Sequence, residues 1–320
     1  MGRNTTDDFK SGTPILTISN GTASFSIAQT NAQVGVGSEL TYGGGAKCYI
    51  KKKNSDTQWQ VTTAAGGVPA DVSGATVEAI RHAFGSLAAA EAGAADAAHL
   101  GTADLVAADL ELHIACYNHL GTADTAPVVV AGWNSDASRF IRIFTPTDTA
   151  TECNASQRHD GTAGSGDRLA PTGDPGTAIV QVSEPFVTRE GLEIRMPALG
   201  STSDEGVRFD FNQAGATGTL RACIIWSEDT TADQDAIYQG LSSGDITVEN
   251  CIIFNWSRSG VHLQAYTTSV FSQHWSVLNC TIHGNGAAGE DESAAIQIRY
   301  GNAASDINVN VVNTIGMGTK

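Results

Sequence analysis

The sequence predicts an all-β fold, a parallel β-solenoid preceded by a small antiparallel β-domain and one capping α-helix. Three observations support this fold class. Glycine supplies 35 of the 320 residues, and Ser, Thr, Asn and Asp crowd the stretches between short apolar runs, which favours many short strands joined by turns. A short apolar run headed by Asn-Cys or a related pair recurs along the second half of the chain. The recurring unit contains strands and turns but no helical pattern.

Composition excludes several classes of protein. With 41% hydrophobic residues the chain can bury a substantial core. The formal net charge of −16 argues against nucleic acid as a partner, because phosphate affinity needs clustered Lys and Arg, and Lys51–Lys53 is the nearest approach. No apolar run reaches about 18 residues, so no membrane span is expected, and the first residues lack the apolar core of a secretory signal peptide.

Residues 1–70 are predicted to form a small β-barrel or sandwich that serves as a docking domain. The runs "PILTIS" and "ASFSIA" flank Asn20-Gly21, a strong signal for a two-residue hairpin turn. The runs "GSELTYGG", "AKCYIKK" and "TQWQVTT" supply three further strands.

Residues 71–104 are predicted to be a capping helix and linker. Val77, Ile80, Phe84 and Leu87 fall on one helical face, and the alanine-rich run that follows has high helix propensity, so we expect one amphipathic helix over residues 75–100. A solenoid needs such a cover at an open end, where unpaired backbone and core would otherwise be exposed.

Residues 105–320 are predicted to form the solenoid, because two independent sets of residues recur at intervals of about 30 residues. The first set follows the Asn-Cys motif and consists of Leu192, Cys223, Cys251, Cys280 and Thr314. The second set starts runs of alternating apolar residues and consists of Val180, Val207, Ile237, Val261 and Ile296. Each repeat is therefore one coil, and neighbouring coils stack at roughly 4.8 Å.

The recurrent cysteines are expected to point into the solenoid core, and the preceding Asn250, Asn279 and Asn313 to stand at a turn. Equivalent Cα atoms on neighbouring coils lie within disulfide range, but side chains in register seldom reach the dihedral angle that a disulfide needs. Reduced, buried thiols are therefore favoured. None of the six cysteines lies in a CxxC pair or a His/Cys cluster with zinc spacing, so neither a metal nor a cofactor is expected.

The segments "EGLEI", "ENCIIFNWSRSGVHL" and "LNCTIHGNG" resemble the repeats of right-handed parallel β-helix proteins. This pectate-lyase-like superfold also builds bacteriophage tailspikes and many bacterial surface proteins. The resemblance covers roughly residues 105–320. It implies the fold and leaves the function open, since the superfold hosts lyases, hydrolases, esterases, adhesins and inert spacers.

If the second set points inward, the residues that follow it point outward. Arg208, Tyr238, His262 and Gln297 then form one outward row, and Asp210, Gly240, Gln264 and Arg299 form the row beside it. A polar, partly aromatic strip on a flat parallel sheet suits an extended glycan, so we assign carbohydrate binding to Arg208, Tyr238, His262, Gln297, Asp210 and Arg299. The alternative is an ordinary solvent-facing surface, which is also polar.

No catalytic residue is assigned. Polysaccharide hydrolysis needs two carboxyl groups about 5 to 9.5 Å apart. Asp233 and Asp235 are weak candidates, and Asp204–Glu205 and Glu290–Glu292 are the other acidic pairs or clusters. All three are predicted to lie in loops, where acids of so acidic a protein usually face solvent. His262, His274 and His283 occupy different places in the coil, so they are interpreted as surface or turn histidines.

These features favour a non-enzymatic structural or adhesive component of an assembly, most simply a bacteriophage tail, neck or head appendage located in the virion. Homo-oligomers, other assembly proteins and a cell-surface polysaccharide are the expected partners. Two alternatives remain, a polysaccharide lyase or hydrolase and a bacterial cell-surface or extracellular-matrix protein.

Overall fold

The computed structural model describes residues 1–2, 5–198, 204–211, 213, 215–228, 234–240, 243–265, 272–284, 294–300 and 306–318. The chain forms two compact units. The first comprises residues 1–103, 113–123 and 144–158, and the second comprises residues 104–112, 124–143 and 159–320. The first unit therefore includes two segments that lie well beyond residue 70.

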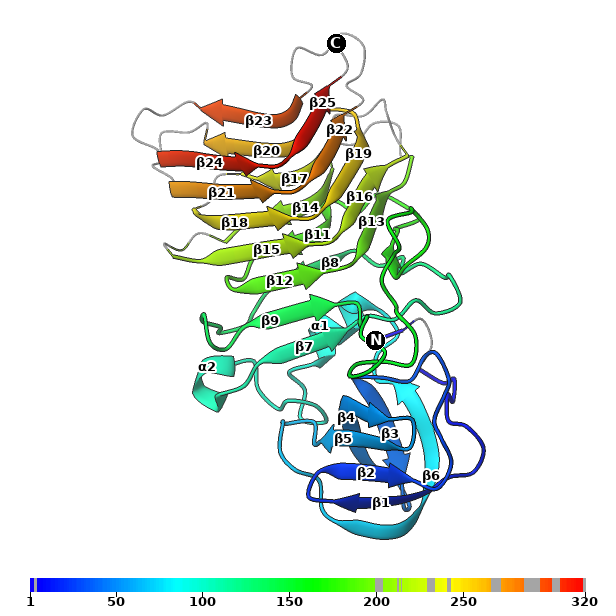
Figure 1. The fold of residues 1–320 in the computed structure, drawn as a ribbon. Coiled ribbons are helices and arrows are strands. Elements are labelled where there is room, and N and C mark those ends of the chain that lie inside the picture. Colours follow the sequence, from blue (N-terminus) through cyan, green and yellow to red (C-terminus); the bar gives the residue numbers. More distant parts are fainter. Residues whose placement is uncertain are drawn as a thin grey trace. The chain divides into compact units, whose positions relative to one another are not determined.

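The first unit contains a closed antiparallel barrel with the strand order β1-β2-β5-β4-β3-β6 (Figure 1). Its strands are β1 (Ile15–Ser19), β2 (Thr22–Phe25), β3 (Ser38–Tyr42), β4 (Ala46–Ser55), β5 (Gln58–Thr62) and β6 (Val72–His82). The predicted hairpin turn is confirmed, since Asn20 and Gly21 join β1 to β2 with φ angles of 47° and 73°. Alternate residues of these strands fill the barrel with a core that includes Leu16, Leu40 and Trp59.

The predicted helix over residues 75–100 is wrong in its first part. Residues 72–82 form β6, which closes the barrel by pairing with both β1 and β3. The register between β6 and β3 shifts between Val77 and Ala79, so Val77 and Ile80 are both buried despite their helix-like spacing. The helix that does form, α1 (Leu87–Gly93), starts at Ser86, whose hydroxyl accepts a hydrogen bond from the Ala89 N–H at 3.0 Å.

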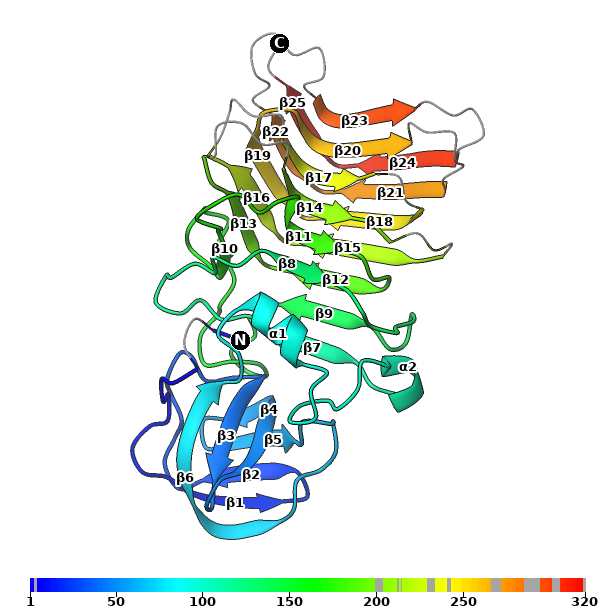
Figure 2. The ribbon, with the colours of Figure 1, turned by 180° about the vertical axis from the view of Figure 1, so that it is seen from behind.

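Three parallel sheets stack coil upon coil, as predicted for a solenoid, and all of their strands except β7 belong mainly to the second unit (Figures 1 and 2). A four-residue helix, α2 (Leu105–Ala108), lies at its start in sequence. The β7 sheet contains β7 (Leu112–Ala115), β9 (Ile141–Phe144), β12 (Val187–Glu190), β15 (Thr217–Arg221), β18 (Gly244–Glu249), β21 (Ser272–Leu278) and β24 (Asp306–Val312).

The other two sheets have six strands each. The β8 sheet contains β8 (Val128–Val130), β11 (Ala178–Val182), β14 (Glu205–Phe209), β17 (Asp235–Gln239), β20 (Ser259–Ala265) and β23 (Ala294–Tyr300). The β10 sheet contains β10 (Arg168–Leu169), β13 (Glu193–Met196), β16 (Ile224–Ser227), β19 (Ile252–Trp256), β22 (Thr281–Gly284) and β25 (Ile315–Gly318).

Both predicted sets of recurring residues stack in register. In the β8 sheet, Val180 pairs with Val207, and the pairing continues coil by coil to Ile237, Val261 and Ile296. In the other set, backbone hydrogen bonds of 2.9 to 3.1 Å tie each coil to the next through the carbonyl groups of Leu192, Cys223, Cys251 and Cys280. The repeat inferred from the sequence is therefore the physical coil.

The recurrent asparagines are explained by backbone geometry. Asn250, Asn279 and Asn313 have φ angles of 56°, 52° and 48°, in the left-handed region that few residues adopt without cost. They form the turn from the β7 sheet to the β10 sheet, and the first two bond the next coil through their N–H groups at 2.9 Å. Asparagine recurs there because it tolerates this conformation better than most other residues.

All six cysteines are buried and none forms a disulfide bond, and Cys223, Cys251 and Cys280 stack inside the solenoid. One other core position is unexpected. Arg189 on β12 is 1% exposed and pairs with Leu220 on β15, so a guanidinium group occupies an otherwise apolar row of the core.

Candidate functional site

The outward side of the β8 sheet carries the predicted rows of polar residues. Arg208 pairs with Tyr238, Tyr238 with His262, and His262 with Gln297 on four consecutive strands. In the neighbouring row, Gln264 pairs with Arg299. The register thus confirms the first predicted row and, in the second, the Gln264–Arg299 pair, whereas the strand pairing ends before Asp210 and Gly240.

A third polar row lies at the start of the same strands. Glu205 pairs with Asp235, and Asp235 with Ser259. A side chain added at Gly206, the residue after Glu205, would collide with the buried Trp256, so Gly206 and Val207 both face the core. Glu205 consequently faces outward with Arg208.

We call the three rows together the polar face. It consists of Glu205, Asp235, Ser259, Arg208, Tyr238, His262, Gln297, Asp210, Gln264 and Arg299.

The polar face is less exposed than a solvent-facing surface. Tyr238 is 8% exposed and His262 is 1% exposed, whereas 29% of the Arg208 side chain is accessible. The interpretation of His262 as a surface or turn histidine is therefore wrong, because it lies within β20 and is covered. The outer members that solvent reaches are Arg208, Asp210, Gln264, Gln297 and Arg299.

Asp235 is the centre of a buried group of charges. Its carboxylate accepts a hydrogen bond from His262 Nδ1 at 2.7 Å and from Arg258 Nε at 3.0 Å, and Arg258 Nη2 is also bonded to it. Because Asp235 is fully buried, its desolvation opposes ionisation. The hydrogen bonds from His262 and Arg258 outweigh that effect and hold the pKa of Asp235 below its ordinary value.

The pKa of Glu205 is shifted in the opposite direction. Burial raises its pKa to about 8, and the neighbouring Asp235 charge adds to the increase although Arg208 opposes it. Arg208 Nη1 lies 3.7 Å from Glu205 Oε1, and Oε2 has no hydrogen-bond partner in the part of the chain that the structure describes. At neutral pH the Glu205 carboxyl group is therefore mainly protonated while its neighbour Asp235 is ionised.

The remaining contacts make the polar face rigid. The Arg208 guanidinium lies 5.2 Å from the centre of the Tyr238 ring, and the His262 ring meets the same ring edge-on at 5.2 Å. Arg208 Nε donates to Asp210 at 2.8 Å, and the Tyr238 hydroxyl is bonded to Gln264. The side chains that could contact a ligand are thus held in one arrangement.

The sequence predicts loops for the acidic pairs, and this prediction is wrong for Asp235 and Glu205. Asp235 begins β17 and Glu205 begins β14. Asp233 and the Glu290–Glu292 cluster lie outside the described residues. The sequence contains a signal for the Glu205–Asp235 pair. Val207 and Ile237 occupy equivalent places on neighbouring coils, and Glu205 and Asp235 each precede one of them by two positions.

The three histidines do not converge. His262 is on the β8 sheet, His274 on the β7 sheet and His283 on the β10 sheet. Exposed His274 lies between Asp245 and Asp306, at 2.9 Å and 3.3 Å. Among the described residues, no group of three or more His, Cys, Asp or Glu side chains is arranged to hold a metal ion.

Comparison with known proteins adds no assignment. No protein-family model matches the chain, and neither the curated proteins nor the solved structures contain a match. Within the described residues, no helix has the length and apolar character needed to cross a membrane.

Proposed function

We propose that this protein is a non-enzymatic, glycan-binding structural component of an assembly, and that the polar face contacts the saccharide. The observation that carries the proposal is the register of Arg208, Tyr238, His262 and Gln297, which places polar side chains at one position on successive coils. A polymer lying along the solenoid axis would meet an equivalent position roughly every 4.8 Å.

The chemistry of the accessible side chains supports a saccharide. Arg208, Asp210, Gln264 and Gln297 supply guanidinium, carboxylate and amide groups, which donate hydrogen bonds to hydroxyl groups and accept them. The buried ring of Tyr238 and the charges behind it fix the position of Arg208. Such a preorganised surface loses little side-chain entropy on binding.

Two further features support the proposal that the protein is part of an assembly. A closed barrel separate from the solenoid is suited to attach the chain to a larger particle. In addition, β23, β24 and β25 expose apolar side chains, among them Ile298, Val311, Ile315 and Met317, which favours contact with a second copy or another protein.

A phage virion is the proposed assembly, and a bacterial surface is the alternative. Mass spectrometry across a density gradient of particles from the producing culture separates them. Sedimentation with a major capsid protein at fixed stoichiometry supports the virion, whereas recovery only from the cell envelope supports the surface protein.

Saccharide binding is expected to depend on Arg208. Replacing Arg208 with glutamine removes a guanidinium group from the polar face, and we expect at least about tenfold weaker binding to oligosaccharides selected from a glycan array. Arg221→Gln is the matched control, because Arg221 is a partly exposed arginine of the β7 sheet that pairs with Glu249 at 3.0 Å. Equal losses in the two variants would contradict binding at the polar face.

One observation favours a polysaccharide hydrolase as a second candidate. Two carboxyl groups on adjacent strands have pKa values shifted in opposite directions, with Glu205 protonated and Asp235 ionised, which is the division of roles that a glycosidase needs. Under this alternative, the wild type depolymerises a bound polysaccharide and Glu205→Gln abolishes the activity while binding is retained. A wild type that binds but releases no reducing ends from any bound polymer excludes the hydrolase.

A further inference from the structure

Charge is distributed unevenly between the two units. The first unit carries 10 acidic and 8 basic residues, whereas the second carries 24 acidic and 10 basic residues. The second unit therefore accounts for −14 of the net charge of −16. Such an acidic unit attracts any uncompensated basic surface of another copy.

Strand β4 of the barrel carries most of the lysines. Four of the six lysines of the chain lie on it, namely Lys47, Lys51, Lys52 and Lys53. The register against β5 shifts between Ile50 and Lys52, so Lys51 is an extra residue at a bulge. Ile50 and Lys53 are buried, and the two lysines between them are both exposed. The bulge thus places two adjacent lysines on the outer surface, whereas successive residues of a regular strand face opposite sides.

The acids near these lysines are already paired with other cations. Lys47 lies 2.8 Å from Glu39, and Lys53 lies 2.8 Å from Asp56. Within the described part of the chain, Lys51 and Lys52 have no ion pair. We call these two residues the basic pair, because they add two uncompensated positive charges to the barrel surface.

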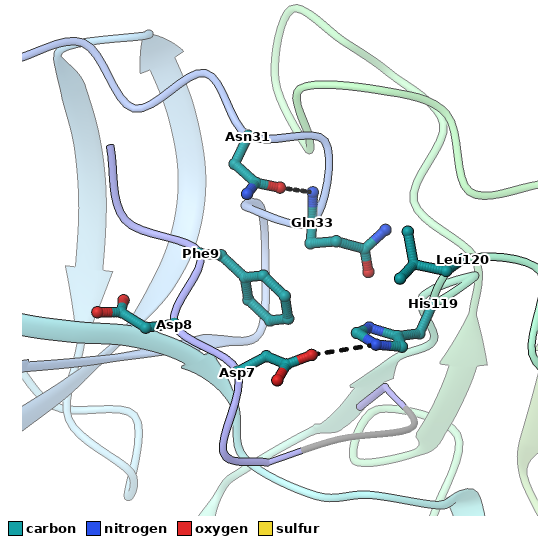
Figure 3. Close-up of a pocket in the computed structure, with 7 residues that line it drawn as sticks. All are labelled: Asp7, Asp8, Phe9, Asn31, Gln33, His119 and Leu120. Atoms are coloured by element: carbon teal, nitrogen blue, oxygen red, sulfur yellow. Dashed lines mark hydrogen bonds and ion pairs between the residues drawn. The ribbon is translucent and has the colours of Figure 1, made fainter. Parts of the chain in front are cut away.

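The acids of the N-terminal segment also have partners of their own. Asp8 pairs with Lys10. Asp7 faces His119 in a pocket beside this segment, and its carboxylate lies 3.2 Å from His119 Nε2 (Figure 3). Neither carboxylate therefore serves as a counter-ion of the basic pair.

The outward side of the β7 sheet is partly balanced in charge. Glu190 is paired with Arg142 at 3.0 Å. Glu249 is paired with Arg221, also at 3.0 Å. These pairs leave Asp245 on β18 and the acid on β24 to be considered.

Asp245 and Asp306 carry the excess negative charge of this sheet, and we call them the acidic pair. Their side chains are 52% and 65% exposed. Among the described residues, His274 is the only cationic group that pairs with either, at 2.9 and 3.3 Å. Because one imidazole carries at most one positive charge, at least one negative charge remains uncompensated.

The spacing of the acidic pair suits the basic pair. Asp245 and Asp306 lie on strands separated by β21, so two strand spacings of roughly 4.8 Å lie between them. Two adjacent lysines on long, flexible side chains span such a distance.

We propose that the basic pair of one copy binds the acidic pair of a second copy, so that the barrel of one chain contacts the solenoid of another. Two different surfaces meet in this contact, so its repetition produces a ring or a filament. The inference rests on the proposal that the protein is part of an assembly. It does not depend on saccharide binding, since neither pair belongs to the polar face.

The contact is expected to be weak and sensitive to salt. Exposed ion pairs contribute little each, and dissolved ions screen them. Opposite charges therefore select which surfaces meet and speed their encounter. We expect the wild type to associate at protein concentrations of about 10 to 500 µM in 50 mM salt, and at least about tenfold more weakly in 500 mM salt.

Sedimentation velocity of the full chain tests the contact with two charge-reversal variants. Lys51→Glu/Lys52→Glu and Asp245→Lys/Asp306→Lys each give the two surfaces like charges. Each variant alone should therefore associate at least about tenfold more weakly than the wild type. An equimolar mixture of the two should restore association, because the reversed surface of each variant then complements the reversed surface of the other.

Net charge cannot account for recovery in the mixture. Both variants remain strongly acidic, and the average charge of the mixture equals that of the wild type. Glu111→Lys/Glu228→Lys is the matched control for the second variant, since it changes the charge equally at exposed positions away from the acidic pair. This control should change association less than about twofold.

Three results would overturn the proposed contact. They are a wild type that stays monomeric at 500 µM in 50 mM salt, a mixture that associates no better than its components, and a control that loses as much association as the second variant. Circular dichroism verifies that each variant is folded. Self-association that survives both charge reversals would also refute this contact, but it would leave the proposed assembly in place through another surface.

Discussion

Replacing Asp235 with asparagine is expected to lower the free energy of unfolding by about 3 to 5 kcal/mol. The carboxylate is fully buried and neutralises Arg258, whose side chain is itself largely covered. Asparagine has nearly the same shape but no charge, so it leaves the Arg258 guanidinium without its buried counter-ion. Urea denaturation followed by circular dichroism measures the loss.

A matched control separates this effect from the general loss of one acid. Asp245→Asn breaks a contact with His274 at 2.9 Å, but the Asp245 side chain is 52% exposed. Solvent screens such a pair, so we expect a change of at most about 1 kcal/mol. Similar losses in the two variants would show that burial does not strengthen the Asp235 contacts.

The Asp235 effect is also expected to depend on pH. The pKa of Asp235 is lower in the folded chain than its ordinary value of 3.8, so its ionised form stabilises the fold above that value. This stabilisation is lost as the pH falls through the folded-state pKa. The difference in unfolding free energy between the wild type and Asp235→Asn should therefore be constant near neutrality and shrink in acid.

Replacing Arg189 with leucine is expected to raise the free energy of unfolding by about 1 to 4 kcal/mol. All three guanidinium nitrogens of Arg189 are buried without a hydrogen-bond partner among the described residues. The neighbouring positions in its row, Leu220 and Val248, are apolar and fully buried. Leucine removes the cost of desolvating the charge and continues the apolar row.

The stability gained in Arg189→Leu is expected to shrink at high pH, whereas the Asp235 effect shrinks at low pH. Burial lowers the pKa of the Arg189 guanidinium to about 9, well below its ordinary value. The folded state is therefore penalised in full below pH 9, where the group is charged in both states. Above pH 9 the folded chain releases the proton, so the advantage of Arg189→Leu should narrow. A variant that is less stable than the wild type at pH 7 would mean that Arg189 has a stabilising partner in the core.

The solenoid could be predicted because equivalent apolar residues recur in each coil. Val207, Ile237 and Val261 occupy one place on successive coils, and each repeat supports the alignment of the others. The sixth strand of the barrel could not be predicted in this way. A local bulge gives Val77 and Ile80 a helix-like spacing, and only the need to close the barrel between β1 and β3 decides that the segment is a strand.

The sequence predicts which residues of the candidate site share a row, but it does not predict how deeply each side chain is buried. The alternation after Val207 and Val261 places Arg208 and His262 on the outward side, which needs only the strand period. Whether His262 is covered depends on packing across coils, which no local pattern encodes. Sequence neighbours also suggested pairing Asp235 with Asp233, whereas the groups that set the ionisation of Asp235 come from β20 and the residue before it.

Hydrogen–deuterium exchange of the full chain, with and without the tightest-binding oligosaccharide from the array, tests the central claim most directly. Saccharide binding on the polar face predicts slower exchange in β14, β17, β20 and β23, and unchanged exchange in β18 and β19. The account is contradicted if no saccharide on the array binds, or if the protected strands belong to the β7 or β10 sheet.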